Sequence, residues 1–152
     1  MDNTNLNKRG IDILADIMQY CDTQTQSNII NGLAPILAKE GKQGLMFELR
    51  RQIVLFDDLA YANTAGIQML LKYVTIKDLA VSLVGAQESV IKNIASAMSK
   101  NMFSDLMAEI TREKNVSKSE ISFARDRILR EVKGLIKEKQ LYLEKPNYNN
   151  IY

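Results

Sequence analysis

The chain has 152 residues, with 20 lysines and arginines, 18 aspartates and glutamates and no histidine, so its formal net charge is +2. Without histidine, a histidine base, a Ser-His-Asp or Cys-His nucleophile pair and a histidine-ligated metal are all excluded. The single cysteine, Cys21, excludes an internal disulfide and a thiolate metal cage. We therefore expect a protein that is not an enzyme and that needs no cofactor or metal.

The N-terminal half of the chain has the apolar spacing of helices. Apolar residues three or four positions apart predict a first helix with one apolar face, made by Ile11, Leu14, Met18 and Cys21. On this face we expect Cys21 to be a buried small hydrophobe, not a reactive thiol.

The polar start of the chain is not a signal peptide, and no run approaches the roughly 20 apolar residues that span a bilayer.

Polar caps and helix breakers predict where the next two helices lie. Asp22 or Thr23 can cap a second helix. Pro35 should end this helix or start the next one, because proline is tolerated in a first turn but not inside a helix. We expect a break near Gly41 and a third helix over residues 43–54.

Shorter helices follow from residue 56 onward. We expect them at 56–61, from Asn63 or Thr64 onward, at 76–84 up to a stop at Gly85, and at 87–98. Ser99 should cap the helix over residues 99–114, and the S-x-x-E box at Ser117 should begin the longest one, over 118–139.

No segment alternates polar and apolar residues as a strand does, so the sequence predicts an all-α fold. Short paired helices suggest an armadillo-like stack.

Two groups of charges are candidate binding surfaces. On the helix after Ser99, Asp105 and Glu109 lie four residues apart, with Arg112 beside Glu109 and Lys100 near the start. This pattern fits an ordinary solvated face or a charged ridge presented to another protein. The last helix is basic, with Arg125, Arg127 and Arg130, but its charges alternate in sign and no aromatic platform accompanies them, so we expect no nucleic-acid binding.

Six short stretches resemble, in order and spacing, the motifs of one protein family. They are Gly10–Met18 (family pattern GGVEAVAEILN), Ile53–Phe56 (MFVF), Phe56–Leu59 (FEDL), Gly66–Val74 (SIQ.LLREV, with the preceding DDR replaced by Asn63-Thr64-Ala65), Lys77–Ala86 (KDLALALKGA) and Asn93–Lys100 (..FLRNMS.R). The family is FliG, the flagellar motor switch protein. The resemblance covers about residues 10–143 and concerns the C-terminal half of FliG, so we expect a fragment or a short homologue.

The resemblance implies a domain organisation and a set of partners. It implies an armadillo-like subdomain over 8–52, a hinge at Ile53, Val54, Leu55 and Phe56, a compact six-helix subdomain over 57–143 and a flexible tail over 144–152. The implied partners are the stator protein MotA, the switch protein FliM and neighbouring FliG subunits in a ring, with or without a domain swap. The implied location is cytoplasmic, at the inner-membrane-associated flagellar basal body, with only peripheral membrane contact.

The chain departs from the family where the charges that transmit torque are expected. Four of the family's five charged positions fall on uncharged residues, namely Val84, Asn101, Ala108 and Ser117, and Glu109 keeps the one acid that remains. In one reading the charge has moved. Asp105 lies one turn before Glu109 on the same face, and Lys100 and Lys118 adjoin the vacated positions at Asn101 and Ser117, so that the ridge still meets a stator. In the other, the chain is a FliG-like paralogue that acts in motor assembly or regulation.

Overall fold

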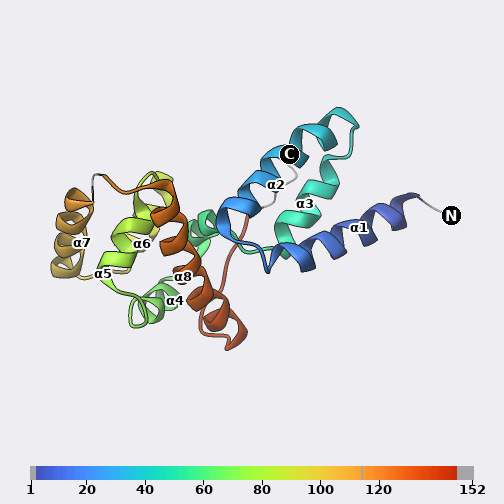
Figure 1. Cartoon of the computed structure of the whole chain (residues 1–152). Coiled ribbons are helices and arrows are strands. Elements are labelled where there is room, and N and C mark those ends of the chain that lie inside the picture. The colour runs from blue at the N-terminus through green and yellow to red at the C-terminus, as the bar shows by residue number, and fades with distance from the viewer. Residues whose placement is uncertain (1–2, 114, 147–152) are drawn as a thin grey trace. The chain divides into compact units, whose positions relative to one another are not determined.

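The structure is a computed structural model that describes residues 3–113 and 115–146, with side chains from residue 7 onward. Figure 1 shows its elements: α1 (Asn3–Met18), α2 (Thr23–Lys39), α3 (Gln43–Gln52), the 3-10 helix η1 (Phe56–Tyr61), α4 (Thr64–Leu70), α5 (Ile76–Leu83), α6 (Glu88–Ser96), α7 (Lys100–Arg112) and α8 (Lys118–Lys137). The described residues form no strand, only an isolated bridge between Ala62 and Leu143. The predicted all-α fold is confirmed.

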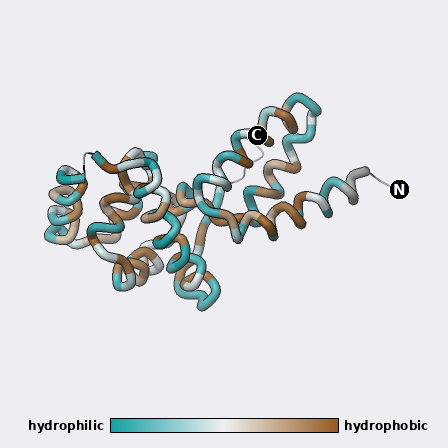
Figure 2. Tube along the Cα trace, in the orientation of Figure 1, coloured by the Kyte–Doolittle hydropathy of each residue, from teal (hydrophilic) through white to brown (hydrophobic). Residues whose placement is uncertain are grey.

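The chain divides into two compact units. The first holds α1, α2 and α3 together with Lys145 and Pro146, and the second is Leu55–Glu144, with η1 and α4 to α8. Apolar and polar residues recur in short runs along the helices (Figure 2), so that each helix has an apolar side to bury. None of the described helices is long and apolar enough to cross a bilayer.

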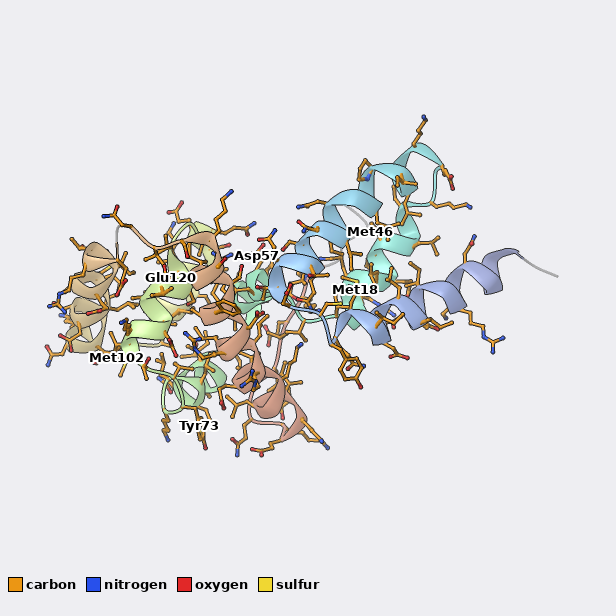
Figure 3. The ribbon with its side chains drawn as sticks, viewed as in Figure 1. Met18, Met46, Asp57, Tyr73, Met102 and Glu120 are labelled. Atoms are coloured by element: carbon orange, nitrogen blue, oxygen red, sulfur yellow. The ribbon has the colours of Figure 1, made fainter. Side chains whose placement is uncertain are left out.

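In the first unit, α3 packs against both α1 and α2. Met18 of α1 and Met46 of α3, labelled in Figure 3, are almost completely buried. The buried Gln26 side chain donates to the Met18 carbonyl at 2.8 Å, which satisfies a carbonyl at the end of α1. The core is completed by Ile11, Ala15, Ile30, Leu37, Leu49 and Ile53.

Two expectations for the first unit are wrong. The second helix does not end or begin at Pro35 but runs through it, and Pro35 is exposed, so water can solvate the carbonyl that the missing N–H leaves free. Cys21 does not lie on the buried face of α1. The helix ends at Met18, and Cys21 follows in a turn, half exposed, with its thiol donating to the Ile17 carbonyl at 3.6 Å.

The predicted break at Gly41 is confirmed. Gly41 has φ +68°, and the Lys42 N–H donates to the Leu37 carbonyl at 2.8 Å, which is the pattern of a glycine-terminated helix. Asp22 is the cap of α2, accepting from the Thr25 N–H at 2.7 Å. The helices α3, α6 and α8 each end two residues before the predicted limit, a difference typical of helix ends.

In the second unit, α5 lies at the centre and packs against both α7 and α8. Leu79 and Ala80 of α5 are fully buried, as are Ala124, Ile128 and Val132 along one face of α8. The returning segment after α8 closes the unit: the Asn63 N–H donates to the Tyr142 carbonyl at 3.0 Å, and the Glu144 N–H donates to the Tyr61 carbonyl at 2.9 Å. A segment near the C-terminus therefore pairs with the start of the unit.

A candidate partner-binding surface on α7

The helix α7 begins at a side-chain cap and packs by one narrow stripe. Ser99 Oγ accepts from the Met102 N–H at 3.2 Å, as predicted from the sequence. Leu106 is the one buried residue of α7, and Met102 and Ile110 beside it are half buried. Since the helix packs mainly against α5, most of its circumference stays open.

The side of α7 opposite Leu106 carries no charge at its centre. A helix turns by about 100° per residue, so Asn101, Ser104, Ala108 and Thr111 lie together on this side, and all four are exposed. We call them the outer face of α7. Thr111 turns its hydroxyl back to the Met107 carbonyl at 2.9 Å.

The charged residues predicted as the binding site lie along one edge of the outer face and at its start. Asp105 and Arg112 are seven residues apart and share this edge, and Lys100 lies in the first turn; all three are exposed. Glu109 lies deeper, with its side chain 19% exposed, and Arg112 Nη1 donates to its carboxylate at 2.8 Å. The structure thus pairs Glu109 with Arg112 and leaves the exposed carboxylate to Asp105.

Apolar side chains line the opposite edge of the outer face. Phe103 and Met107 are one turn apart, and they are 39% and 43% exposed. The candidate surface is therefore mixed, with charges along one edge and a phenylalanine–methionine pair along the other.

Four positions are uncharged in this chain where the family resemblance places charges. Two of them cap helices, and the other two are exposed to solvent. Val84 is the C-cap of α5, and its carbonyl accepts from the Arg125 guanidinium at 3.2 Å. Ser117 is the N-cap of α8, where its hydroxyl accepts from the Glu120 N–H while the Glu120 carboxylate accepts from the Ser117 N–H. Asn101 and Ala108 lie on the outer face of α7.

The arginines of the basic last helix do not form a common surface. Arg125 is half buried and donates to the carbonyls of Ser82 and Val84, and this burial lowers the pKa of its guanidinium. Arg127 binds both oxygens of Asp78, at 3.1 and 2.7 Å, and this hydrogen bonding raises its pKa. The third arginine, Arg130, is exposed to solvent. Two of the three arginines are therefore used within the second unit.

The predicted hinge residues differ in burial. Ile53 and Phe56 are buried, whereas Val54 and Leu55 are half buried.

The described residues include no group of acidic or cysteine side chains able to hold a metal ion.

A family model described as the FliG C-terminal domain matches residues 37–143. The chain belongs to this FliG family. The flagellar motor switch protein FliG of Thermotoga maritima is 29% identical over 126 residues, which are 83% of this chain and 36% of the relative. The FliG of Pseudomonas aeruginosa is 28% identical over 120 residues, 79% of this chain and 34% of the relative. The chain thus spans about a third of the length of these relatives.

Solved FliG structures share the fold. A crystal structure of Helicobacter pylori FliG, residues 86–343, has a TM-score of 0.63 at 16% identity and covers 84% of this chain and 58% of that one. The structure of full-length FliG from Aquifex aeolicus has a TM-score of 0.57 at 23% identity and covers 85% of this chain and 39% of that one. The resemblance predicted from the motifs is therefore confirmed.

Proposed function

We propose that this FliG-family chain is a non-enzymatic rotor or switch-complex component of the bacterial flagellar motor. Support comes from the family match over 107 of 152 residues, counting 37 to 143 inclusive, and from relatives named as flagellar motor switch proteins. In this role the chain works at the cytoplasmic side of the inner membrane, in the basal body, and contacts the membrane only through its partners.

In the proposed role, α7 is the helix that faces the stator protein MotA. The observation that carries this proposal is the exposure of α7, which is held by one buried residue, Leu106. Lys100, Asp105 and Arg112 are open to a partner, and Glu109 orients Arg112 through their ion pair. Charges at a protein interface set register and steer approach more than they add affinity. A defined register between rotor and stator is what the transmission of torque and rotation sense requires.

The remaining proposed partners follow from family membership. Neighbouring FliG subunits would pack on the first unit in a ring, with or without a domain swap, and FliM would belong to the same switch complex. Residues 53–56 would let the second unit reorient when the motor switches.

A second candidate function is favoured by the uncharged outer face of α7. A FliG-like paralogue that acts in motor assembly or regulation would keep the fold without the torque charges. Asn101 and Ala108 occupy the middle of the outer face, where the family resemblance places charges. In such a chain the Phe103–Met107 edge, and not the charged edge, would make the main contact.

Charge reversal separates the two candidates. In a strain that depends on this gene for swimming, Asp105→Lys with Glu109→Lys should slow swimming or change rotation sense if α7 faces the stator. The control reverses two exposed acids of the first unit, Asp16→Lys with Glu40→Lys. Circular dichroism must show that both variants keep their helix content. Normal swimming of the α7 variant, together with a full-length FliG gene in the same genome, would favour the paralogue.

A further inference from the structure

The longest helix, α8, has one buried face and one face that meets solvent. The buried face packs against α5 and α4, with Ile128 at its middle. Because a helix turns by about 100° per residue, the side opposite Ile128 is formed by Phe123, Arg130 and Lys137, which follow one another at seven-residue spacing and are all exposed. We call these three residues, together with the exposed Gly134 beside them, the outer stripe of α8.

An aromatic side chain lies at the N-terminal end of the outer stripe. Phe123 is 62% exposed, more than any other described phenylalanine of the chain. The rings of Phe47 and Phe56 each lie beneath an arginine guanidinium, and within the described part of the chain Phe123 has no such contact. Burial of an exposed ring against a partner removes apolar surface from water, which is why aromatic residues are common anchors of interfaces.

The other end of the outer stripe carries two positive charges that have no neighbour of opposite sign. Among the described residues, the side chains of Arg130 and Lys137 make no hydrogen bond and no ion pair, whereas Arg127 is bound by both oxygens of Asp78. Asp126 is the acid of α8 nearest to the stripe around the helix, and it is half buried and has a partner already. The outer stripe therefore attracts carboxylates from outside the chain.

Gly134 leaves room between the two charges. Apart from the nearby backbone of α8 itself, no atom lies within 4 Å of a β-carbon built at this position. The distance between two packed helices depends on the side chains at their contact, so a second helix can approach α8 closely here. Seven residues is also the repeat with which one helix packs along another. The stripe is therefore better suited to a straight helical segment than to an irregular loop.

We propose that the outer stripe of α8 is a docking surface for an acidic amphipathic helix of another protein. An apolar residue of that helix packs on Phe123, and two of its carboxylates, at the same seven-residue spacing, meet Arg130 and Lys137. The ring supplies burial, and the charges set the register. Two free charges are too few for the phosphate contacts on which nucleic-acid binding depends. The surface lies on a different helix from α7, so the proposal goes beyond the proposed function.

A synthetic helical peptide with a fluorescein label is the probe for this surface. It carries one leucine followed, at seven-residue spacing, by two glutamates on the same face, with alanine and glutamine elsewhere. Fluorescence anisotropy measures its binding to the full chain, and we expect an affinity that falls as salt screens the charges. A second peptide has the same composition but carries its glutamates on the opposite face. Equal binding of both peptides, or no binding of the first at low salt, would overturn the proposal.

Charge reversal tests the basic end of the stripe. Arg130→Glu with Lys137→Glu should weaken peptide binding about tenfold. Arg9→Glu with Lys72→Glu changes the net charge of the chain by the same amount at two exposed residues outside α8 and should have little effect. Equal losses in the two double variants would show that the total charge, and not the stripe, attracts the peptide.

Two further variants test the ring and the glycine. Phe123→Ala should weaken binding about tenfold, whereas Tyr73→Ala, at a ring that is 59% exposed outside α8, should not. Gly134→Leu should block close approach of the peptide without harm to the helix. Circular dichroism checks that each variant keeps its helix content, and Phe123→Gln, with the same loss expected, replaces Phe123→Ala if that variant unfolds. Unchanged affinity of the Phe123 variant would exclude the ring as an anchor.

Photocrosslinking in the source cells then tests the natural occupant. p-Benzoylphenylalanine replaces Phe123 in the full chain, and in a control chain it replaces Tyr73. We expect position 123 to give an adduct that mass spectrometry maps to a helix of another protein with carboxylates at seven-residue spacing. An adduct with a second copy of this chain or with lipid, or no adduct beyond that of the control, would overturn the proposal. Since α7 is unchanged in every variant, this failure is distinct from a failure of the proposed motor role.

Discussion

The guanidinium of Arg125 lies 4.7 Å from the centre of the Phe56 ring and at the same time donates hydrogen bonds to the carbonyls of Ser82 and Val84. One side chain of α8 thus joins the first turn of η1 to the end of α5. Each of these contacts links segments more than 40 residues apart in the sequence. The arginine is half buried, and the nearby Asp57 carboxylate partly offsets the effect of burial on its pKa.

Arg125→Met should destabilise the second unit. The change removes two hydrogen bonds from a charged donor and a cation–π contact, and we expect a loss of about 2 kcal/mol in the free energy of unfolding. Urea unfolding followed by circular dichroism measures it. The exposed Arg130 gives the control, since Arg130→Met should cost little. Equal losses in both variants would mean that Arg125 acts only through its charge.

Gly66→Ala should also destabilise the second unit. A β-carbon at Gly66 would overlap Asn63 Oδ1 and lie 2.8 Å from Leu141 Cγ and 2.9 Å from Leu141 Cα. Because the returning backbone itself must shift, we expect a cost of about 1–3 kcal/mol. The control is Gly134→Ala, near the C-terminal end of α8, where no atom outside the helix's own nearby backbone lies within 4 Å of the new carbon. Thermal unfolding should rank Gly134→Ala above the parent chain, by up to about 1 kcal/mol, and Gly66→Ala below it.

Lys139→Gly should stabilise the chain. Lys139 has φ +58° in the turn that ends α8, where the Gln140 N–H donates to the Leu135 carbonyl at 2.8 Å. A left-handed conformation costs a residue with a β-carbon about 1 kcal/mol relative to glycine. The same substitution at Lys137, the last residue of α8, should instead lower stability, by at most about 1 kcal/mol. The two melting temperatures should move in opposite directions, and a shared fall would contradict the prediction.

Ser117→Ala should cost about 1 kcal/mol at neutral pH, because it removes a helix cap. Its effect should also depend on pH. Hydrogen bonds from the backbone N–H and the hydroxyl of Ser117 lower the pKa of Glu120 from its ordinary 4.5. Such a carboxylate adds stability above its unfolded pKa and loses it as the pH falls through the lower folded pKa.

The stability difference between the parent chain and Ser117→Ala should therefore shrink as the pH falls below 4.5, the ordinary pKa of Glu120. Urea unfolding at a series of pH values measures this difference. Ser119→Ala changes an exposed serine in the first turn of the same helix and serves as control, with no pH-dependent difference expected. The backbone N–H of residue 117 still donates to Glu120 in this variant, so a gap that stays constant with pH would argue against a contribution of the Ser117 hydroxyl to the lowered pKa of Glu120.

Local features of the sequence were enough to predict most helix limits. The caps at Asp22, Ser99 and Ser117 and the stop at Gly41 all act on backbone groups a few residues away, so the sequence carries their geometry directly. Pro35 shows the limit of such rules. Whether a proline breaks a helix depends on whether the freed carbonyl is exposed, and that is a property of the packed unit.

The sequence by itself determined the all-α fold, the family and the helix that carries the candidate surface, because these follow from short-range periodicity and ordered motifs. Only the tertiary structure decided how the charges are used. In the sequence Arg125, Arg127 and Lys145 are simply three basic residues. In the structure Arg125 binds the Ser82 and Val84 carbonyls, Arg127 binds Asp78, and Lys145 binds the end of α3. Their partners lie 43, 49 and 95 residues away, and packing alone brings them within reach.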